Sequence, residues 1–202
     1  MFSGCFVSHF CRHFLKADDD TWVNVPGLMH VLKMHSSDLD IAIGGHCSDK
    51  AFPNRNRKSK YFTSFNDYPQ KLYPGFCNGP CYTSSLALAR NVTSVSPSVP
   101  FFHLEDVYLS LCVQKLEKPF SLKKLSGFLV RSKNVCWMKS LSCVSVHQVS
   151  PALLRKTWEA ECPKSDFEVW PVGRAKSLLG PWREGGEGGR VGASKTGEVH
   201  KI

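Results

Sequence analysis

The sequence predicts an α/β fold, because strand-like and helix-like segments alternate from the first apolar run onward. Cys11–Ala17 is typical of a short buried strand, and it ends at three consecutive carboxylates. Asn24 is a favourable helix N-cap, and Pro26 then falls in the first helical turn, where a missing N–H is harmless. A second strand, Leu39–Gly45, is expected to stop at its paired glycines.

Further helices and one strand are expected in the second half of the chain. Ser84–Asn91 is a predicted helix, and His103–Leu116 is the clearest helix in the sequence because its apolar residues share one face. Cys143–His147 has the composition of a short strand. Ser150 is placed to cap a last helix that begins at Pro151.

The segments between these elements carry a weaker pattern. Ala51–Lys60 is polar and basic and is expected to be an exposed loop, followed by an edge strand at Lys60–Thr63. Tyr73–Tyr82 is dense in turn formers and aromatic residues, which predicts a loop. Its aromatic side chains have two open interpretations: they pack on the core, or they form the wall of a sugar or nucleotide pocket.

Composition limits the classes of function. The chain has 202 residues, enough for one domain, and its 42% hydrophobic content suffices for a core. The net charge of +9 raises nucleic acid as a partner, but the basic residues are scattered and no repeated basic–aromatic motif is present, so no nucleic-acid binding is expected. No stretch reaches the about 18 apolar residues of a membrane-spanning helix.

Nine cysteines suggest an oxidising compartment. Their spacings, such as Cys77 to Cys81, do not repeat as paired CxxC knuckles, so no structural zinc site is expected. Asn91-Val92-Thr93 is an N-glycosylation sequon, which is consistent with a secretory route.

The acidic run Asp18-Asp19-Asp20 is the first candidate for chemistry. Three adjacent like charges repel one another, and a folded chain tolerates them best beside a cation. Carboxylate oxygens favour Mn²⁺ or Mg²⁺ over zinc, so Asp18 and Asp20 are candidate ligands of a divalent metal. The alternative is a solvated acidic turn that helps to cap the next helix.

Glu105, Asp106 and His147 are further candidates, each with a structural alternative. The two acids lie in the first turn of the predicted helix, where the helix dipole favours negative charge, but either one could also act as a general base. His147 ends a predicted strand and is either a structural histidine or a metal ligand.

Four segments, in this order, resemble glycosyltransferase family 31, the β-1,3-galactosyltransferases and β-1,3-N-acetylglucosaminyltransferases. The resemblance covers roughly residues 11–161, and the matching segments are KADDDTWVNVPGLMHVL, SKYFTSFNDYPQKLYPGFCNGPCYTSS, HLEDVYLSLCVQKL and VSVHQVSPALLRKTW. It implies a GT-A fold with a mixed sheet flanked by helices, a UDP-sugar donor, Mn²⁺ and inversion at the anomeric carbon. The last two segments look closest to the galactosyltransferase branch.

The resemblance also implies roles for single residues. Asp18–Asp20 would be the family's DxD motif, with Asp20 as main metal ligand, Asp18 and Asp19 beside the donor, and His147 completing the metal shell. Asp106 would be the base that takes the proton from the 3-hydroxyl of an acceptor sugar on a glycoprotein or glycolipid.

A second group of residues is implied only by matching positions. Glu105, Tyr73 and Gly79 would contact the acceptor. Cys112 and Cys136 match positions that pair as a disulfide in relatives.

The chain also departs from the family pattern. It begins just before the DxD motif, so the opening nucleotide-binding strands are expected to be missing from an otherwise GT-A-like domain at residues 11–170. Residues 1–10 look foreign to the family, and the Gly-rich basic tail at 171–202 is expected to be disordered. The Tyr-Pro loop has Asn78-Gly79-Pro80-Cys81 where the family has a Ser-Gly-x-Gly step.

Three functions remain open from the sequence. The first is an inverting, Mn²⁺-dependent transferase of galactose or, as the second choice, N-acetylglucosamine, at the Golgi membrane, although the sequence shows no signal or anchor. The second is a catalytically inactive form that acts only as a binding partner. The third, a basic nucleic-acid binder, is the least expected.

Overall fold

The computed structural model describes residues 12–117, 120–128 and 131–163. The predicted leader at 1–10 and the predicted tail at 171–202 lie outside these residues. Within them, no helix is both long enough and apolar enough to span a membrane.

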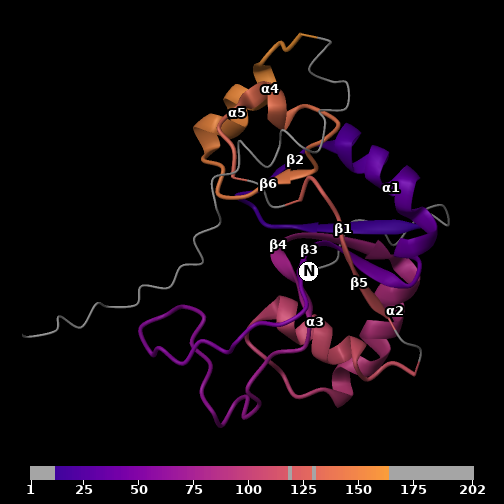
Figure 1. Ribbon diagram of the computed structural model, residues 1–202, viewed down its shortest axis with the longest axis vertical. Helices are drawn as coiled ribbons and strands as arrows, with labels where there is room; N and C mark the ends of the chain where they lie inside the picture. Colours follow the sequence, from indigo (N-terminus) through magenta and orange to yellow (C-terminus); the bar gives the residue numbers. More distant parts are fainter. Residues whose placement is uncertain (1–11, 118–119, 129–130, 164–202) are drawn as a thin grey trace, which may run out of the picture.

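A mixed four-stranded sheet forms the centre of the fold (Figure 1). Its order is β1 (His13–Ala17), β4 (Phe76–Ser85), β3 (Ala42–Ser48) and β5 (Ser121–Lys124). β4 runs antiparallel to both neighbours, whereas β3 and β5 are parallel. A separate antiparallel pair joins β2 (Trp22–Val23) to β6 (Ser145–Val146).

Helices cover both faces of the sheet (Figure 1), and successive side chains of a strand point to opposite faces. In β1, Leu15 packs on the side of α1 (Val25–Leu39). Its neighbour Phe14 packs in the cluster that includes residues of α2 (Leu86–Val95) and α3 (Glu105–Val113). The predicted α/β fold with a mixed sheet flanked by helices is therefore confirmed.

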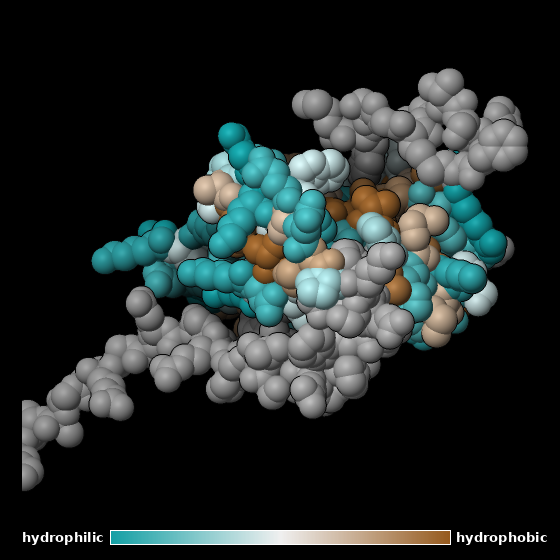
Figure 2. Space-filling model, turned by 90° about the horizontal axis from the view of Figure 1, so that it is seen from above, coloured by the Kyte–Doolittle hydropathy of each residue, from teal (hydrophilic) through white to brown (hydrophobic). Residues whose placement is uncertain are grey.

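The remaining elements lie at the other end of the molecule from α3 (Figure 1). They are α4 (Val135–Met138) and α5 (Pro151–Glu159). A short 3₁₀ helix, Ser96–Ser98, instead follows α2 and accepts a hydrogen bond from the Tyr108 hydroxyl of α3. Figure 2 looks onto the α4 and α5 end, where apolar side chains lie in separate groups among hydrophilic ones on the described surface.

The predicted N-cap of α5 is confirmed, since the Ser150 side chain accepts a hydrogen bond from the Leu153 N–H.

The largest error of the sequence prediction concerns Tyr73–Tyr82, most of which is strand β4 rather than a loop. The turn formers fall where the ladder to β3 is interrupted, because the register moves from Gly45–Tyr82 to Cys47–Cys77 across a bulge. Pro80 lies in that gap and beyond the end of the β1 pairing, so its missing N–H breaks no ladder.

Two other strand predictions were wrong. Lys60–Thr63 is not a strand and contributes only an isolated bridge between Asn54 and Phe62. Strand β3 continues through its paired glycines. A Cβ at Gly44 would stand 2.5 Å from side-chain atoms of both Leu39 and Leu125, so this glycine permits close packing rather than ending the strand.

The predicted Cys112–Cys136 disulfide was also wrong. Cys136 pairs with Cys162, and Cys47 pairs with Cys77. Cys112 is a buried free thiol on α3, which lies at the opposite end of the molecule from α4 (Figure 1). A disulfide needs Cα atoms within about 7 Å, so α3 and α4 cannot be joined in this fold.

Candidate metal and catalytic site

The acidic turn that follows β1 is held by backbone hydrogen bonds. The Asp18 N–H donates to the Pro80 carbonyl at 3.0 Å, and the Thr21 N–H donates to the Asp18 carbonyl at 3.2 Å, which closes the turn. The Asp20 carbonyl accepts from the Val149 N–H at 2.9 Å. These hydrogen bonds fix the backbone of the turn without using the Asp18 or Asp20 carboxylates.

His147 reaches this turn through the pairing of β2 with β6. Trp22 pairs with Val146, so the residue after β6 lies beside the residues before β2. Gln148 follows in the left-handed region with φ 59°, and this turns the chain back toward Asp20. His147 Nε2 lies 3.3 Å from Asp20 Oδ1.

The β6 segment is itself fastened to the start of α1. The buried Asn24 side chain does not cap its helix but donates to the carbonyls of Ser140 at 2.7 Å and Cys143 at 2.9 Å. Gly27 lets the helix approach, because a Cβ there would stand 2.0 Å from the Cys143 carbonyl oxygen. Residues far apart in sequence are thus fixed around the acidic turn.

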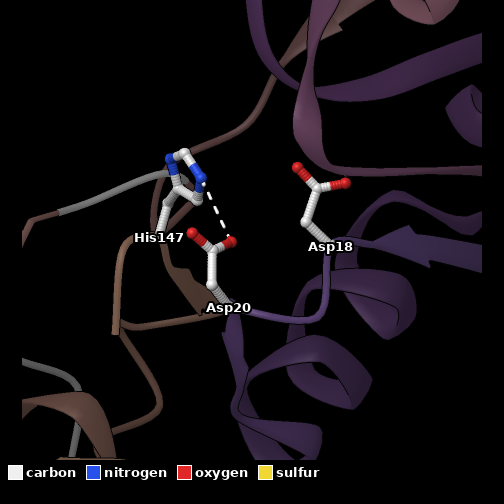
Figure 3. Close-up of side chains that lie close together, drawn as sticks. All are labelled: Asp18, Asp20 and His147. Carbon is white, nitrogen blue, oxygen red and sulfur yellow. Dashed lines mark ion pairs between the residues drawn. The ribbon is translucent and has the colours of Figure 1, made fainter. Parts of the chain in front are cut away.

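Asp18, Asp20 and His147 form a group that could hold a cation. One ligand atom from each lies within 4.8 Å of the others, and Figure 3 shows Asp18 facing the Asp20–His147 pair. Two carboxylate oxygens and an imidazole nitrogen fit Mn²⁺. With three protein ligands, coordination positions remain for a substrate. Asp19 is exposed and lies outside the group.

Glu105 and Asp106 begin α3 on the neighbouring side of the site. Asp106 accepts hydrogen bonds from the Gly79 N–H at 3.0 Å and from the Val107 N–H at 2.9 Å. Glu105 accepts from the Tyr82 hydroxyl, and burial together with the Glu105 charge raises the pKa of Tyr82, so this phenol stays protonated. Both acids lie in the first turn of α3, where the helix dipole favours negative charge.

Lys16 connects the two groups, and the sequence analysis missed it. Its Nζ contacts Asp18 Oδ1, the Gly79 carbonyl oxygen at 2.6 Å and Glu105 Oε2 at 3.5 Å. Burial opposes its charge, but the hydrogen bond to Asp18 and the Glu105 charge outweigh burial and raise the pKa of Lys16. The available signal was strand alternation, because Lys16 and Asp18 are two residues apart and share a face of the chain.

Tyr73 does not lie on the surface of the site. Its side chain is 6% exposed, its hydroxyl shares a hydrogen bond of 2.6 Å with Thr63 Oγ1, and its ring packs against Tyr68 and Phe102. The core interpretation of this aromatic residue is therefore the correct one.

Asn91 of the sequon is exposed on α2.

Comparison with known proteins assigns the family. A family model described as Galactosyltransferase matches residues 5–120. Mouse (Mus musculus) β-1,3-galactosyltransferase 5 is 33% identical over 159 residues, which cover 77% of this chain and 51% of the relative. The chain belongs to this galactosyltransferase family.

Two further mouse relatives carry different names. β-1,3-Galactosyltransferase 2 is 31% identical over 76% of this chain and 37% of its own length. N-acetyllactosaminide β-1,3-N-acetylglucosaminyltransferase 4 is 29% identical over 77% of this chain and 44% of its own length. The chain thus spans about half the length, or less, of the curated relatives it matches.

Proposed function

We propose that this chain carries the metal-binding and acceptor-activating part of an inverting, Mn²⁺-dependent β-1,3-galactosyltransferase. The observation that supports this proposal best is the set of contacts that links the Asp18, Asp20 and His147 group to the two acids of α3. Lys16 contacts Asp18 and Glu105, and Gly79 contacts both Lys16 and Asp106. Galactose is the proposed sugar because the matching family and two of the three relatives described above are named for it. N-acetylglucosamine is the alternative.

Each residue of the site has a proposed role. Asp20, Asp18 and His147 would hold Mn²⁺, with Asp20 as the main ligand, and Asp18 and Asp19 would also face the UDP-sugar. The ion supplies Lewis-acid stabilisation of the negative charge on the departing diphosphate. Because the Asp18 and Asp20 backbone is fixed by hydrogen bonds to Pro80 and Val149, the ligands are arranged before the substrate arrives.

Asp106 is the proposed catalytic base. It removes the proton from the 3-hydroxyl of the acceptor sugar while that oxygen forms a bond to C1 of the donor and the bond from C1 to the UDP oxygen breaks. The Gly79 and Val107 N–H groups orient the carboxylate. Attack opposite the leaving group inverts the anomeric carbon. Glu105 and Gly79 contact the acceptor.

A secretory setting is part of the proposal. Disulfides form in oxidising compartments, and the described residues contain two of them, Cys47–Cys77 and Cys136–Cys162. The exposed Asn91 is accessible for N-glycosylation. The family resemblance points to the Golgi membrane, and the acceptor is a glycan on a glycoprotein or glycolipid.

The test combines binding and transfer with the full chain. With Mn²⁺ present, UDP should bind saturably in calorimetry, and Asp106→Asn should retain UDP binding while losing transfer from UDP-galactose by about 100-fold or more, within the range for general base catalysis. Asp49→Asn is the control, because Asp49 is exposed and pairs with Lys124 instead. Undiminished turnover by Asp106→Asn would reject the base assignment, and absence of UDP binding would favour a binding partner without catalytic activity.

A further inference from the structure

Lys16 occupies a position that the proposed reaction does not explain. Its side chain is 23% exposed and reaches from the end of β1 between the two acidic groups of the site. On the metal side it contacts Asp18, and on the other side it contacts Glu105. In the described part of the chain, no other lysine or arginine forms an ion pair with either carboxylate.

Gly79 extends this connection to Asp106. The Gly79 carbonyl accepts a hydrogen bond from Lys16 Nζ at 2.6 Å, while the Gly79 N–H donates to Asp106 Oδ2 at 3.0 Å. Both backbone polar groups of Gly79 are therefore hydrogen-bonded, the carbonyl to Lys16 and the N–H to Asp106. The Lys16 ammonium group fixes the carbonyl, and the same backbone fixes the carboxylate.

The bulge in β4 makes this arrangement sensitive to Lys16. Gly79 lies between Cys77 and Tyr82, where β4 lacks ladder partners in β3, and beyond Cys81, where the β1 pairing ends. No β-ladder partner constrains its orientation, so the contacts of Lys16 and Asp106 do.

We propose that Lys16 is a positioning residue that couples occupancy of the metal site to the placement of Asp106. This inference rests on the proposed function, since it gives Asp106 and the metal ligands the roles stated above. The ammonium group neutralises Asp18 and holds Gly79. A divalent cation at Asp18 competes with Lys16 for that carboxylate, which shifts Lys16 toward Gly79 and Glu105 and tightens the contacts that orient Asp106.

The first test measures Mn²⁺ affinity by electron paramagnetic resonance of the free ion, using the full chain. Lys16→Met removes the charge that competes for Asp18, so Mn²⁺ should bind about threefold to tenfold more tightly. Lys16→Arg retains the charge and should bind Mn²⁺ within about twofold of the unsubstituted chain. Lys123→Met is the matched control, because Lys123 lies on β5 and pairs with Asp38 on α1 instead.

A second measurement needs neither metal nor activity. Hydrogen exchange of the segment 78–80 should be faster in Lys16→Met than in the unsubstituted chain, while exchange in α2 should be unchanged. Lys16→Gln keeps a hydrogen-bond donor for the Gly79 carbonyl without the charge. It should therefore tighten Mn²⁺ binding with a smaller change in exchange, and it also serves if Lys16→Met does not fold.

The outcomes separate the inference from the proposed function. Weaker or equal Mn²⁺ binding by both neutral variants would overturn the coupling even if the unsubstituted chain binds Mn²⁺ well. Unchanged exchange at 78–80 in both would overturn it independently. Failure of the unsubstituted chain to bind Mn²⁺ would instead count against the proposed function, and the exchange measurement would still decide whether Lys16 positions Gly79.

Discussion

Two irregular segments of this molecule are held in place in different ways. The acidic turn at residues 18–21 is fixed mainly by main-chain hydrogen bonds to β4 and to the segment after β6. The long loop at residues 51–75 projects from the sheet (Figure 1) and is organised by one side chain, Arg55. A segment fixed by its backbone tolerates changes of its own side chains, whereas a segment gathered by one residue depends on that residue.

Arg55 contacts most of the loop that it organises. Its guanidinium donates to the carbonyls of Thr63 and Ser64 at 2.9 and 2.7 Å, and to those of Tyr68 and Gln70 at 2.8 and 3.2 Å. It also lies 4.0 Å from the centre of the Phe65 ring. Charge-assisted hydrogen bonds of this kind are stronger than neutral ones.

The largest expected effect comes from disturbing the support of the acidic turn rather than the turn itself. In Gly27→Ala the added methyl group would meet the Cys143 carbonyl oxygen at 2.0 Å, so α1 and the segment before β6 must separate. We expect a loss of about 3 kcal/mol or more in the free energy of unfolding, measured by urea denaturation. Gly79→Ala is the control, since its Cβ would have an ordinary contact of 3.4 Å; equal stability of the two variants would contradict this account.

Arg55→Ala should produce the next largest effect. Four carbonyls lose a charged donor, so we expect the free energy of unfolding to fall by about 2–3 kcal/mol. The loop should also become the first site of cleavage in limited proteolysis. The exposed Arg57 provides the control as Arg57→Ala. If both variants are cleaved at the same rate, Arg55 does not organise the loop.

Thr21→Ala should have a smaller effect. The Thr21 hydroxyl donates to the Pro80 carbonyl at 3.3 Å, and the main-chain bonds of the turn remain after its removal. We expect a loss of about 1 kcal/mol in thermal or urea unfolding, with Mn²⁺ affinity changed by less than about threefold. A loss of Mn²⁺ binding comparable to that caused by removing a ligand would show that side chains, not the backbone, hold the turn.

The buried thiols should be almost unreactive in the folded chain. Burial raises the pKa of Cys81 to about 11 and also raises the pKa of Cys112 and Cys143. These thiols should resist alkylation at pH 8 until the chain unfolds, because the thiolate is the reactive form. Non-reducing peptide mapping should then show Cys47 joined to Cys77 and Cys136 joined to Cys162; a Cys112–Cys136 peptide would contradict the fold.

The same thiols imply a pH dependence of stability. For Cys81, ionisation begins near the ordinary thiol pKa of 9.0 in the unfolded chain but only near 11 in the folded one. The stabilising contribution is therefore complete below pH 9 and decreases as the pH rises toward 11. Cys81→Ser should flatten this dependence in urea titrations at pH 8–11.

The sequence predicted those site residues whose residue type and neighbours form a recognisable local pattern, and it failed where no such pattern exists. The acidic run, the acids at the start of α3 and the histidine after a short strand were all recognisable, and the resemblance supplied their roles. Lys16 was missed because a single lysine in an apolar strand has no distinctive pattern. The role of Lys16 depends on its hydrogen bond to Gly79, which lies 63 residues further along the chain.

The fold errors have related causes. Pro80 and Gly79 suggest a loop by composition, yet they belong to β4 because a bulge accommodates them. Gly44 suggests a break, yet it admits Leu39 and Leu125 into close contact with β3. Local composition could not reveal either tertiary arrangement.

Titration of the full chain with Mn²⁺ tests the central claim most directly, with Asp20→Asn as the variant and Asp49→Asn as the control. Asp20 offers one of the three ligand atoms, whereas the exposed Asp49 pairs with Lys124 away from the group. The account predicts saturable binding by the unsubstituted chain and by Asp49→Asn, and affinity lower by about tenfold or more in Asp20→Asn. Equal affinity of the two variants, or binding by neither of them nor by the unsubstituted chain, would contradict it.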